Sequence, residues 1–228
     1  TGPVQRLFFA QRAAGPAQTW STPSVVTDVA IDYEMSIEAC PSLAADNRGG
    51  LHLAWNGRAA NGNAGVYVSR YGTQTGAWEP PAEVASDRPA TCPKLVSDAG
   101  GDLHLAWVDS GNVNYRRFNR ALGGWGEPLR LSSAAENFSA PEVSVGSDGA
   151  VYVAWVARSD GRYTLHFRQR RPNEPWGAPM AIATNSPTAS CGASQSSDDR
   201  PAEVRPVIAA DKNGMVHLLW THEVCRRI

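Results

Sequence analysis

Four copies of one ten-residue segment constrain the fold of this chain more than any other feature. Every copy has a glycine six residues before a tryptophan, with an alternating apolar run between them. The copies are DNRGGLHLAW (46–55), DAGGDLHLAW (98–107), GSDGAVYVAW (146–155) and DKNGMVHLLW (211–220). Repeated units of this kind cannot bury their apolar faces alone, so neighbouring units must stack on one another.

A second set of tryptophans follows the same rhythm. Each is followed by proline three residues later, and the two sets together account for all 8 tryptophans of the chain. The second set comprises Trp20, Trp78, Trp125 and Trp176. Spacing within a set runs from 47 residues (Trp78 to Trp125) to 65 residues (Trp155 to Trp220). Periods of about 40 to 50 residues with several strands per unit are typical of propeller blades.

Each repeat predicts four short strands, which we name A to D in chain order. The 21 glycines and 16 prolines punctuate short alternating runs, a pattern that favours strands over helices. Strand A begins at a proline, strand B is the LHLAW segment, strand C follows it, and strand D follows the second tryptophan. The prolines that begin strand A are Pro41, Pro93, Pro141 and Pro206.

The turn between strands A and B has its own signature. The glycine at its fixed place predicts a backbone site with positive φ, where a side chain would clash. We expect Asp46, Asp98 and Asp211, which open the turn, to accept hydrogen bonds from its backbone amides. The third repeat departs from the others, because Gly146 takes the aspartate's place and Asp148 follows two residues later.

The predicted fold class is all-β: a single domain, 1–228, forming a β-propeller of about four four-stranded antiparallel blades. Three blades are complete, and the N-terminus supplies strands C and D of a further blade while the C-terminus supplies strands A and B. The predicted blades are 39–86, 91–133 and 139–184, and the half blades are 4–27 and 204–228. Pairing the half blades would close a ring and remove its open edges. The alternatives are a segment of a longer propeller and a chain that closes by dimerising.

Composition narrows the functional classes. The net charge of −1 gives no overall field that would attract nucleic acid, and no apolar run approaches the ~18 residues of a membrane span. The chain opens at Thr1 without a signal peptide, so we expect a processed or trimmed chain. The four cysteines contain no CxxC pair, which disfavours zinc. They predict either disulfides of undetermined pairing or buried thiols, and we expect neither a cofactor nor a metal. They are Cys40, Cys92, Cys191 and Cys225.

The aligned pattern, P-x-h-x-x-D-x-x-G-x-h-H-L-A-W followed by an h-x-h-x-R strand and W-x-x-P, resembles the sialidase-type (BNR-like) propeller repeat. The resemblance covers most of residues 5–221 and implies a secreted, extracellular or cell-surface protein that binds or acts on glycans. Two features of the family are missing: the Asp-box S-x-D-x-G-x-T-W is degenerate, and no arginine stands two residues before a strand A proline. The residues at that place are Ala39, Thr91, Ser139 and Val204, and Arg205 lies one position off.

Side chains repeated in every blade are expected to be structural. We expect His52, His104 and His217 to pack rather than share a metal, because residues repeated about a propeller axis lie too far apart for one ion. The repeated tryptophans are expected to fill the core, and the strand C arginines to cover apolar surface with their stems. If any tryptophan contacts a ligand, the strand B set is better placed.

Function is therefore expected in the irregular loops between strands B and C and between strands D and A, which emerge at one end. The predicted ligand-binding residues are Asp32, Tyr33, Glu34, Asp87, Arg88, Glu136, Asn137, Asp199 and Arg200. No catalytic residue is assigned. The leading hypothesis is a non-catalytic module that binds a glycan or an extracellular protein, or a structural subunit of an extracellular assembly; a homo-oligomer stays open. The alternative is a sialidase-like glycoside hydrolase, which needs two carboxyl groups at a set separation, or a fragment of a larger propeller enzyme.

Overall fold

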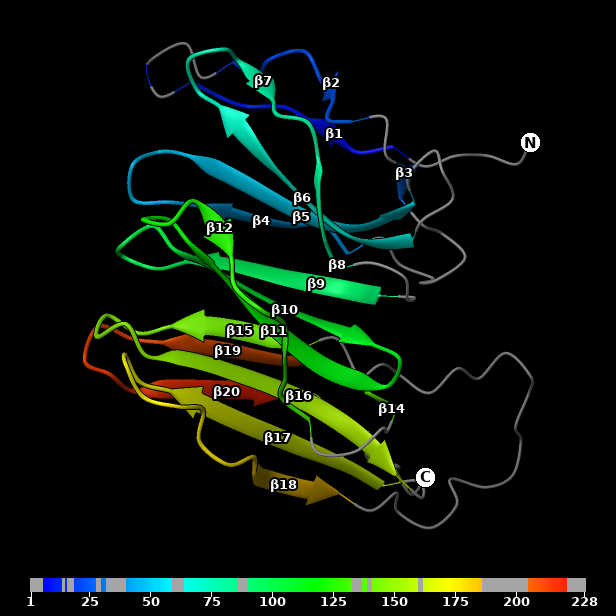
Figure 1. The fold of residues 1–228 in the computed structure, drawn as a ribbon, viewed down its shortest axis with the longest axis vertical. Helices are drawn as coiled ribbons and strands as arrows, with labels where there is room; N and C mark the ends of the chain where they lie inside the picture. Colours follow the sequence, from blue (N-terminus) through cyan, green and yellow to red (C-terminus); the bar gives the residue numbers. More distant parts are fainter. Residues whose placement is uncertain are drawn as a thin grey trace, which may run out of the picture.

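The computed structural model describes residues 6–13, 15, 19–27, 30–31, 40–58, 64–85, 90–132, 137–138, 141–159, 162–185 and 205–220. Every regular element among them is a β-strand, and every paired strand is antiparallel. Three large sheets stack in chain order along the long axis of the molecule, and two hairpins accompany the first and the third of them (Figure 1). The predicted all-β fold with four-stranded antiparallel blades is confirmed.

The first sheet consists of six β-segments that form four strands, because strands A and D are each interrupted. Strands B and C are β5 and β6, paired along their length from Leu51↔Tyr71 to Arg58↔Ala64. Both β3 and β4 pair with β5, so together they make strand A; β7 and β8 both pair with β6 and make strand D. The bounds are β3 (Ala30–Ile31), β4 (Ser42–Ala45), β5 (Leu51–Arg58), β6 (Ala64–Gly72), β7 (Ala77–Trp78) and β8 (Ala82–Ala85).

The second and third sheets repeat this order. In both sheets, strands B and C again form the longest pair. Strand D is split into β12 and β13 in the second sheet, and strand A is split into β14 and β15 in the third. The second sheet comprises β9 (Ala90–Ser97), β10 (Leu103–Asp109), β11 (Asn112–Asn119), β12 (Gly124–Trp125) and β13 (Leu129–Arg130). The third comprises β14 (Asn137–Phe138), β15 (Glu142–Val145), β16 (Val151–Ser159), β17 (Arg162–Arg170) and β18 (Met180–Asn185).

Strand A extends further back than its proline in these sheets. In the second sheet β9 begins at Ala90, three residues before Pro93, and its register with β10 shifts between Ala106 and Val108. Proline has no amide hydrogen to donate, and Cys92 beside it has a φ of 44°. The ladder is therefore irregular at the proline but does not begin there.

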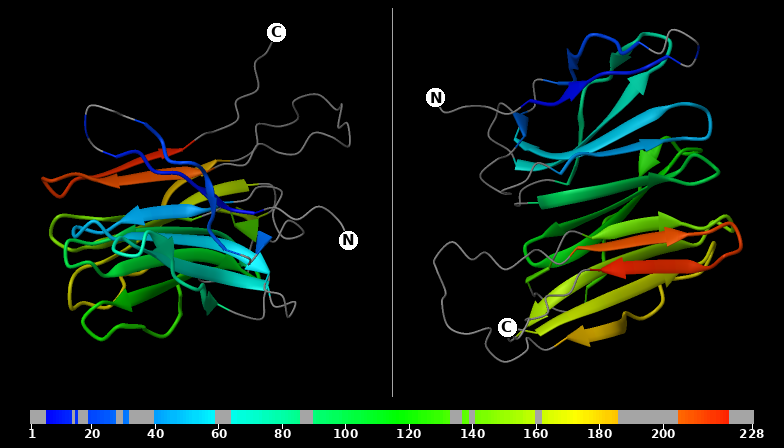
Figure 2. Two further views of the ribbon diagram at one scale, coloured as in Figure 1. Left: turned by 90° about the horizontal axis from the view of Figure 1, so that it is seen from above. Right: turned by 180° about the vertical axis from the view of Figure 1, so that it is seen from behind.

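Two hairpins lie at the ends of the stack. β1 (Phe8–Phe9) pairs with β2 (Ser24–Val25), and β19 (Pro206–Ala210) pairs with β20 (Val216–Trp220). The first hairpin lies beyond the first sheet, and the second lies alongside β15 and β16 of the third sheet (Figures 1 and 2). No pairing joins the hairpins within the described part of the chain, so the closed ring stays a prediction.

Apolar side chains fill each interface between neighbouring sheets. Trp55, Trp107 and Trp155 of strand B are 1%, 2% and 1% exposed, and each lies in a different cluster. Trp107 packs with residues of both the first and second sheets, and Trp155 with residues of both the second and third. These three tryptophans form the core, as the repeat predicted, and none is exposed for a ligand. The prediction is wrong for Trp20, which is 68% exposed.

Hydrogen bonds also join neighbouring sheets. The Leu95 amide donates to Oγ of Ser42, and the Ala210 amide donates to Oγ of Ser144, at 3.0 and 3.1 Å. Arg168 of β17 donates to the carbonyl of Leu131, at the end of strand D in the second sheet, at 2.7 Å. The strand C arginines were expected to act mainly through their stems, whereas Arg168 is half-buried and ties two sheets together by its guanidinium.

The turns between strands A and B have the predicted geometry. Gly49, Gly101, Gly149 and Gly214 have φ values of 80°, 84°, 79° and 81°. Asp46 Oδ1 accepts hydrogen bonds from the amides of Arg48 and Gly50, at 2.9 and 2.7 Å. The turn thereby fixes the Asp46 carboxylate beside the start of β5, where it forms part of the pocket described below.

Candidate functional site

The end that bears the B–C and D–A loops was predicted to carry the ligand site. Asp32, Tyr33, Glu34, Asp87, Arg88, Glu136, Asp199 and Arg200 lie outside the described residues, and for Asn137 only the backbone of β14 is described. The strands that flank these segments do reach one end, because their outermost pairs are Ala30↔Arg58, Ala90↔Asp109, Asn137↔Arg158 and Asn185↔Tyr163. The assignment of these residues to a site stays a prediction.

A disulfide joins two blades at this end. Cys40 and Cys92 are bonded, which links the segment just before β4 of the first sheet to the first residues of β9 in the second. The sequence left the pairing open, because strand A of each blade is adjacent to the next only once the blades have stacked. Cys191 and Cys225 lie outside the described residues.

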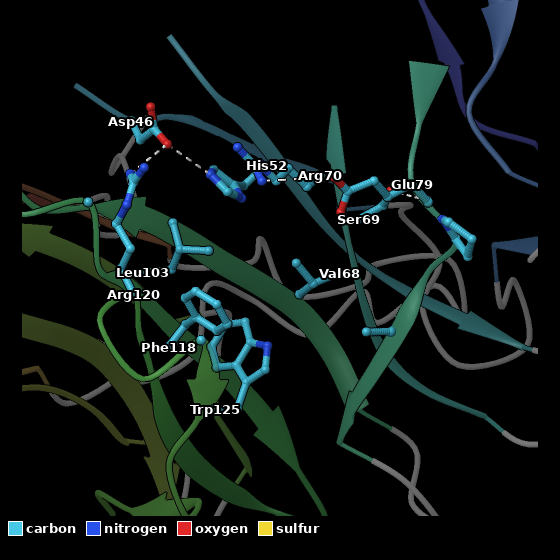
Figure 3. Close-up of a pocket in the computed structure, with 14 residues that line it drawn as sticks. Asp46, His52, Val68, Ser69, Arg70, Glu79, Leu103, Phe118, Arg120 and Trp125 are labelled. Atoms are coloured by element: carbon cyan, nitrogen blue, oxygen red, sulfur yellow. Dashed lines mark hydrogen bonds and ion pairs between the residues drawn. The ribbon is translucent and has the colours of Figure 1, made fainter. Parts of the chain in front are cut away.

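A pocket of about 430 Å³ lies at the opposite end, between the first and second sheets (Figure 3). Its apolar wall combines β6 of the first sheet with β10, β11 and β12 of the second. Its polar groups come from the A–B turn, β5, β6 and the segment between β7 and β8 of the first sheet, and from the C–D turn of the second. The lining residues are Asp46, His52, Val68, Ser69, Arg70, Glu79, Pro80, Ala82, Gly101, Leu103, Phe118, Arg120, Gly123 and Trp125.

Asp46 is the most buried charged group of the pocket, with a side chain 3% exposed. Its Oδ2 lies 3.3 Å from Nε2 of His52 and 3.4 Å from a guanidinium nitrogen of Arg120, which reaches across from the second sheet. Burial works against the charged carboxylate, but the amides of Arg48 and Gly50 and the contact with His52 outweigh it. The pKa of Asp46 is therefore lowered, and the carboxylate stays ionised.

His52 is neutral at neutral pH. Burial lowers the pKa of His52 below its ordinary value, and Arg70 and Arg120 nearby lower it further, although the Asp46 carboxylate pulls it upward. The neutral ring must donate its Nε2 hydrogen to Asp46, so its Nδ1 is a lone-pair acceptor. No described residue donates a hydrogen bond to that Nδ1.

Two further charges line the mouth of the pocket. A guanidinium nitrogen of Arg70 lies 3.9 Å from a carboxylate oxygen of Glu79, and both side chains are 53% exposed. An exposed pair at this distance contributes little to stability. The two arginines and two carboxylates balance in charge, which leaves a pocket that is polar but electrically neutral.

Sequence reasoning missed this pocket because its residues belong to two different repeats. The signal was nevertheless present in strand C, where Val68 occupies the place of Tyr115 in the second repeat and of Phe167 in the third. A smaller side chain at one of three equivalent positions predicts a void at one interface only.

Among the repeated histidines, His104 has the packing role that the sequence predicted, whereas the His217 side chain is 58% exposed and His52 lines the pocket. His104 is 1% exposed and both of its ring nitrogens have partners, Asp98 at 3.2 Å and the Tyr115 hydroxyl at 2.7 Å. Within the described ranges, no group of three or more His, Cys, Asp or Glu side chains could hold a metal ion. No helix capable of crossing a membrane occurs in the same part of the chain.

Solved structures of similar fold include a sialidase, an arabinanase and a trans-sialidase. The chain superposes on a Hadza microbial sialidase with a TM-score of 0.56 and 13% identity, over 87% of this chain and 49% of that one. It superposes on Penicillium chrysogenum α-L-arabinanase, complexed with arabinobiose, with a TM-score of 0.55 and 14% identity, over 94% and 67% of the two chains. For a leech intramolecular trans-sialidase the TM-score is 0.52 and the identity 11%, over 93% and 33%.

These likenesses establish the propeller fold. The chain spans about half the length of the sialidase and a third of the trans-sialidase. No family model matches the chain. No curated protein matches it by sequence.

Proposed function

We propose that the chain belongs to an extracellular carbohydrate-active propeller protein of the sialidase-like superfamily, and that it acts as a glycoside hydrolase. The observation that carries this proposal is the shared fold. A sialidase, an arabinanase and a trans-sialidase superpose on this chain over most of its length. Fold likeness alone is an argument by analogy, so the assignment needs a site that supplies the chemistry.

The proposed site is the end bearing the B–C and D–A loops. Hydrolysis of a glycosidic bond needs an acid and a second carboxyl group, separated by about 5 Å in retaining enzymes and more in inverting ones. The segments attached to this end supply five carboxyl groups: Asp32, Glu34, Asp87, Glu136 and Asp199. The Cys40–Cys92 disulfide supports the same end, because it fixes the starts of two strands that flank these segments.

The disulfide also supports an extracellular location. Disulfides persist in oxidising compartments and are rare in the cytosol. A cross-link between two blades next to the loops would hold a binding surface in place under those conditions.

The test is hydrolysis of a panel of fluorogenic glycosides that includes sialosides and arabinosides. We expect turnover of at least one substrate, and a loss of about 100-fold or more when one of the five carboxylates is replaced by its amide, as in Glu136→Gln. Glu174→Gln, at an exposed C–D turn, is the matched control and should keep full activity. No turnover of any glycoside would refute the hydrolase assignment.

A second candidate is a non-catalytic propeller that binds a glycan or an extracellular protein. It is favoured by Ala39, Thr91, Ser139 and Val204, which stand where catalytic sialidases carry an arginine. A glycan array would support this candidate if it shows binding without turnover. Binding should then weaken in variants of the loop residues such as Arg88→Ala and Arg200→Ala.

A further inference from the structure

The interface between the second and third sheets contains a phenol ring that the chain itself supplies. The Tyr115 hydroxyl lies 2.7 Å from Nδ1 of His104, and the two rings stack with their centroids 6.1 Å apart. The same phenol meets Trp176 of the third sheet edge to face, at 4.9 Å. Burial raises the pKa of Tyr115 to about 12, so the hydroxyl keeps its hydrogen and donates it to His104.

The interface between the first and second sheets has the same frame but lacks the ring. His52 corresponds to His104, Trp125 corresponds to Trp176, and each histidine is bonded to the aspartate six residues before it. The residue equivalent to Tyr115 is Val68, which pairs with Ala54 as Tyr115 pairs with Ala106. The pocket of about 430 Å³ lies at this position, and His52, Val68 and Trp125 all line it.

The third sheet shows that an aromatic ring is the usual occupant. Phe167 stands at the equivalent place and stacks on Tyr152, with ring centroids 6.0 Å apart. Of the three complete sheets, only the first has an aliphatic residue there. The pocket therefore results from the smaller side chain at position 68, and the other interfaces between sheets keep an aromatic ring at this place.

The hydrogen-bonding state of His52 indicates which group the pocket accepts. Its Nδ1 is an acceptor, as that of His104 is, but the described residues provide no donor for it. Because the His52 side chain is only 10% exposed, an acceptor on its ring gains from a partner, so the favoured ligand carries a hydroxyl. The balanced charges of Arg70, Glu79, Asp46 and Arg120 favour a neutral ligand over an ion of either sign.

We propose that this pocket binds a neutral six-membered ring that carries a hydroxyl group, with the hydroxyl donating to Nδ1 of His52 and the ring packing beside Trp125 in the place that Tyr115 fills in the next blade. Phenols and pyranose sugars share this chemistry. The pocket lies at the opposite end from the proposed hydrolase site, so this inference stands or falls independently of it.

The experiment titrates the full chain with three probes: p-cresol, toluene and methyl β-glucopyranoside. Binding is followed by the ring resonances of His52 and the indole resonance of Trp125. We expect p-cresol or the glucoside, or both, to shift these resonances and to bind at least about tenfold more tightly than toluene, which has no hydroxyl. Binding of p-cresol alone identifies a phenol site, and binding of the glucoside alone a sugar site.

Two substitutions at equivalent positions provide matched controls. Val68→Tyr should fill the pocket and reduce probe binding at least about tenfold. Tyr115→Val should open an equivalent pocket beside His104 and Trp176, so that the probe then shifts the resonances of these residues as well. The second variant tests the proposal even if the first one fails to fold.

The proposal is overturned if no probe shifts the His52 or Trp125 resonances. It is also overturned if toluene binds as tightly as the hydroxylated probes, or if folded Val68→Tyr binds them unchanged.

Discussion

Nε2 of His104 lies 3.2 Å from Oδ2 of Asp98, six residues earlier in the chain. The same pairing joins Asp46 to His52 and Asp211 to His217, both at 3.3 Å. The aspartate also accepts a backbone amide of its own turn, so one carboxylate fixes both the turn and the first residues of strand B.

In the third sheet, both the aspartate and the histidine of this pair are replaced by other residues. Gly146 stands in the aspartate's place and Tyr152 in the histidine's, and a Cβ added to Gly146 would lie 3.3 Å from the Tyr152 ring. The tyrosine ring therefore occupies space that the carboxylate would need, while Asp148 accepts the amide of Ala150 instead. Either solution keeps the turn hydrogen-bonded.

Asp98→Ala should destabilise the protein by about 2–3 kcal/mol, because it leaves the Nε2 hydrogen of His104 buried without an acceptor. The His104 side chain is 2% exposed. Asp211→Ala removes the same turn bonds beside His217, whose side chain is 58% exposed, and should cost much less. Urea unfolding followed by tryptophan fluorescence measures both variants, and equal losses would contradict the role of burial.

Stability should fall as the pH drops below about 6.5. Burial lowers the pKa of His52 and of His104 in the folded protein from the ordinary value of 6.5. The unfolded chain therefore binds protons first, so this stability is complete above about pH 6.5 and is lost as the pH falls toward the folded values.

Buried aspartates make stability depend on pH in a second, lower pH range. The pKa values of Asp46 and Asp102 are lowered from 3.8 in the folded protein, so their contribution is lost as the pH falls below that value. Urea midpoints measured at about pH 7.5, 5.5 and 3.5 separate the two windows. His104→Gln should reduce the loss of stability between about pH 7.5 and 5.5; a rise in stability over this range in the unsubstituted protein would contradict the assignment.

Arg168→Met should cost about 1–3 kcal/mol. It removes hydrogen bonds to the carbonyls of Leu131 and Gly177, both at 2.7 Å, but keeps much of the apolar stem. Arg171→Met, at an exposed position just after β17, is the control and should be close to neutral. Thermal unfolding of both variants gives the comparison, and an unchanged Arg168→Met midpoint would show that the guanidinium is dispensable.

Gly49→Ala should cost about 1 kcal/mol, because Gly49 has a φ of 80° and an L side chain disfavours this region. A Cβ at Gly49 would meet no heavy atom within 4 Å, so the cost is conformational and not steric. Gly124→Ala also meets nothing within 4 Å but has no positive φ, and should not destabilise. Chemical unfolding of the pair tests this, and similar values for both would argue against backbone strain.

Reduction of the Cys40–Cys92 disulfide should destabilise the protein by about 3–4 kcal/mol, since it closes a separation of 52 residues. Urea midpoints with and without reductant measure the effect. The Cys40→Ser/Cys92→Ser variant should be destabilised by a similar amount under non-reducing conditions. An unchanged midpoint on reduction would mean that sheet packing alone holds the two strands.

The sequence predicted the features that depend on the order of residues within one repeat. Gly49 and its three equivalents have the expected positive φ, and the turn aspartates accept the expected amides. The tryptophans of strand B were predicted as core, and Trp55, Trp107 and Trp155 are. The assignment of a ligand site to the loops is untested, because their side chains lie outside the described residues.

The sequence therefore determined the structure of each single repeat. Glycine stands where the backbone turns, aspartate stands where the turn amides need an acceptor, and apolar residues alternate along strands that have two faces. The contacts between repeats were decided only by how the sheets stack. The Cys40–Cys92 bond, the reach of Arg168 to Leu131 and the pocket beside Val68 each join residues of different repeats. These contacts depend on the angle and separation of neighbouring sheets, which the packing of whole faces sets and no single repeat encodes.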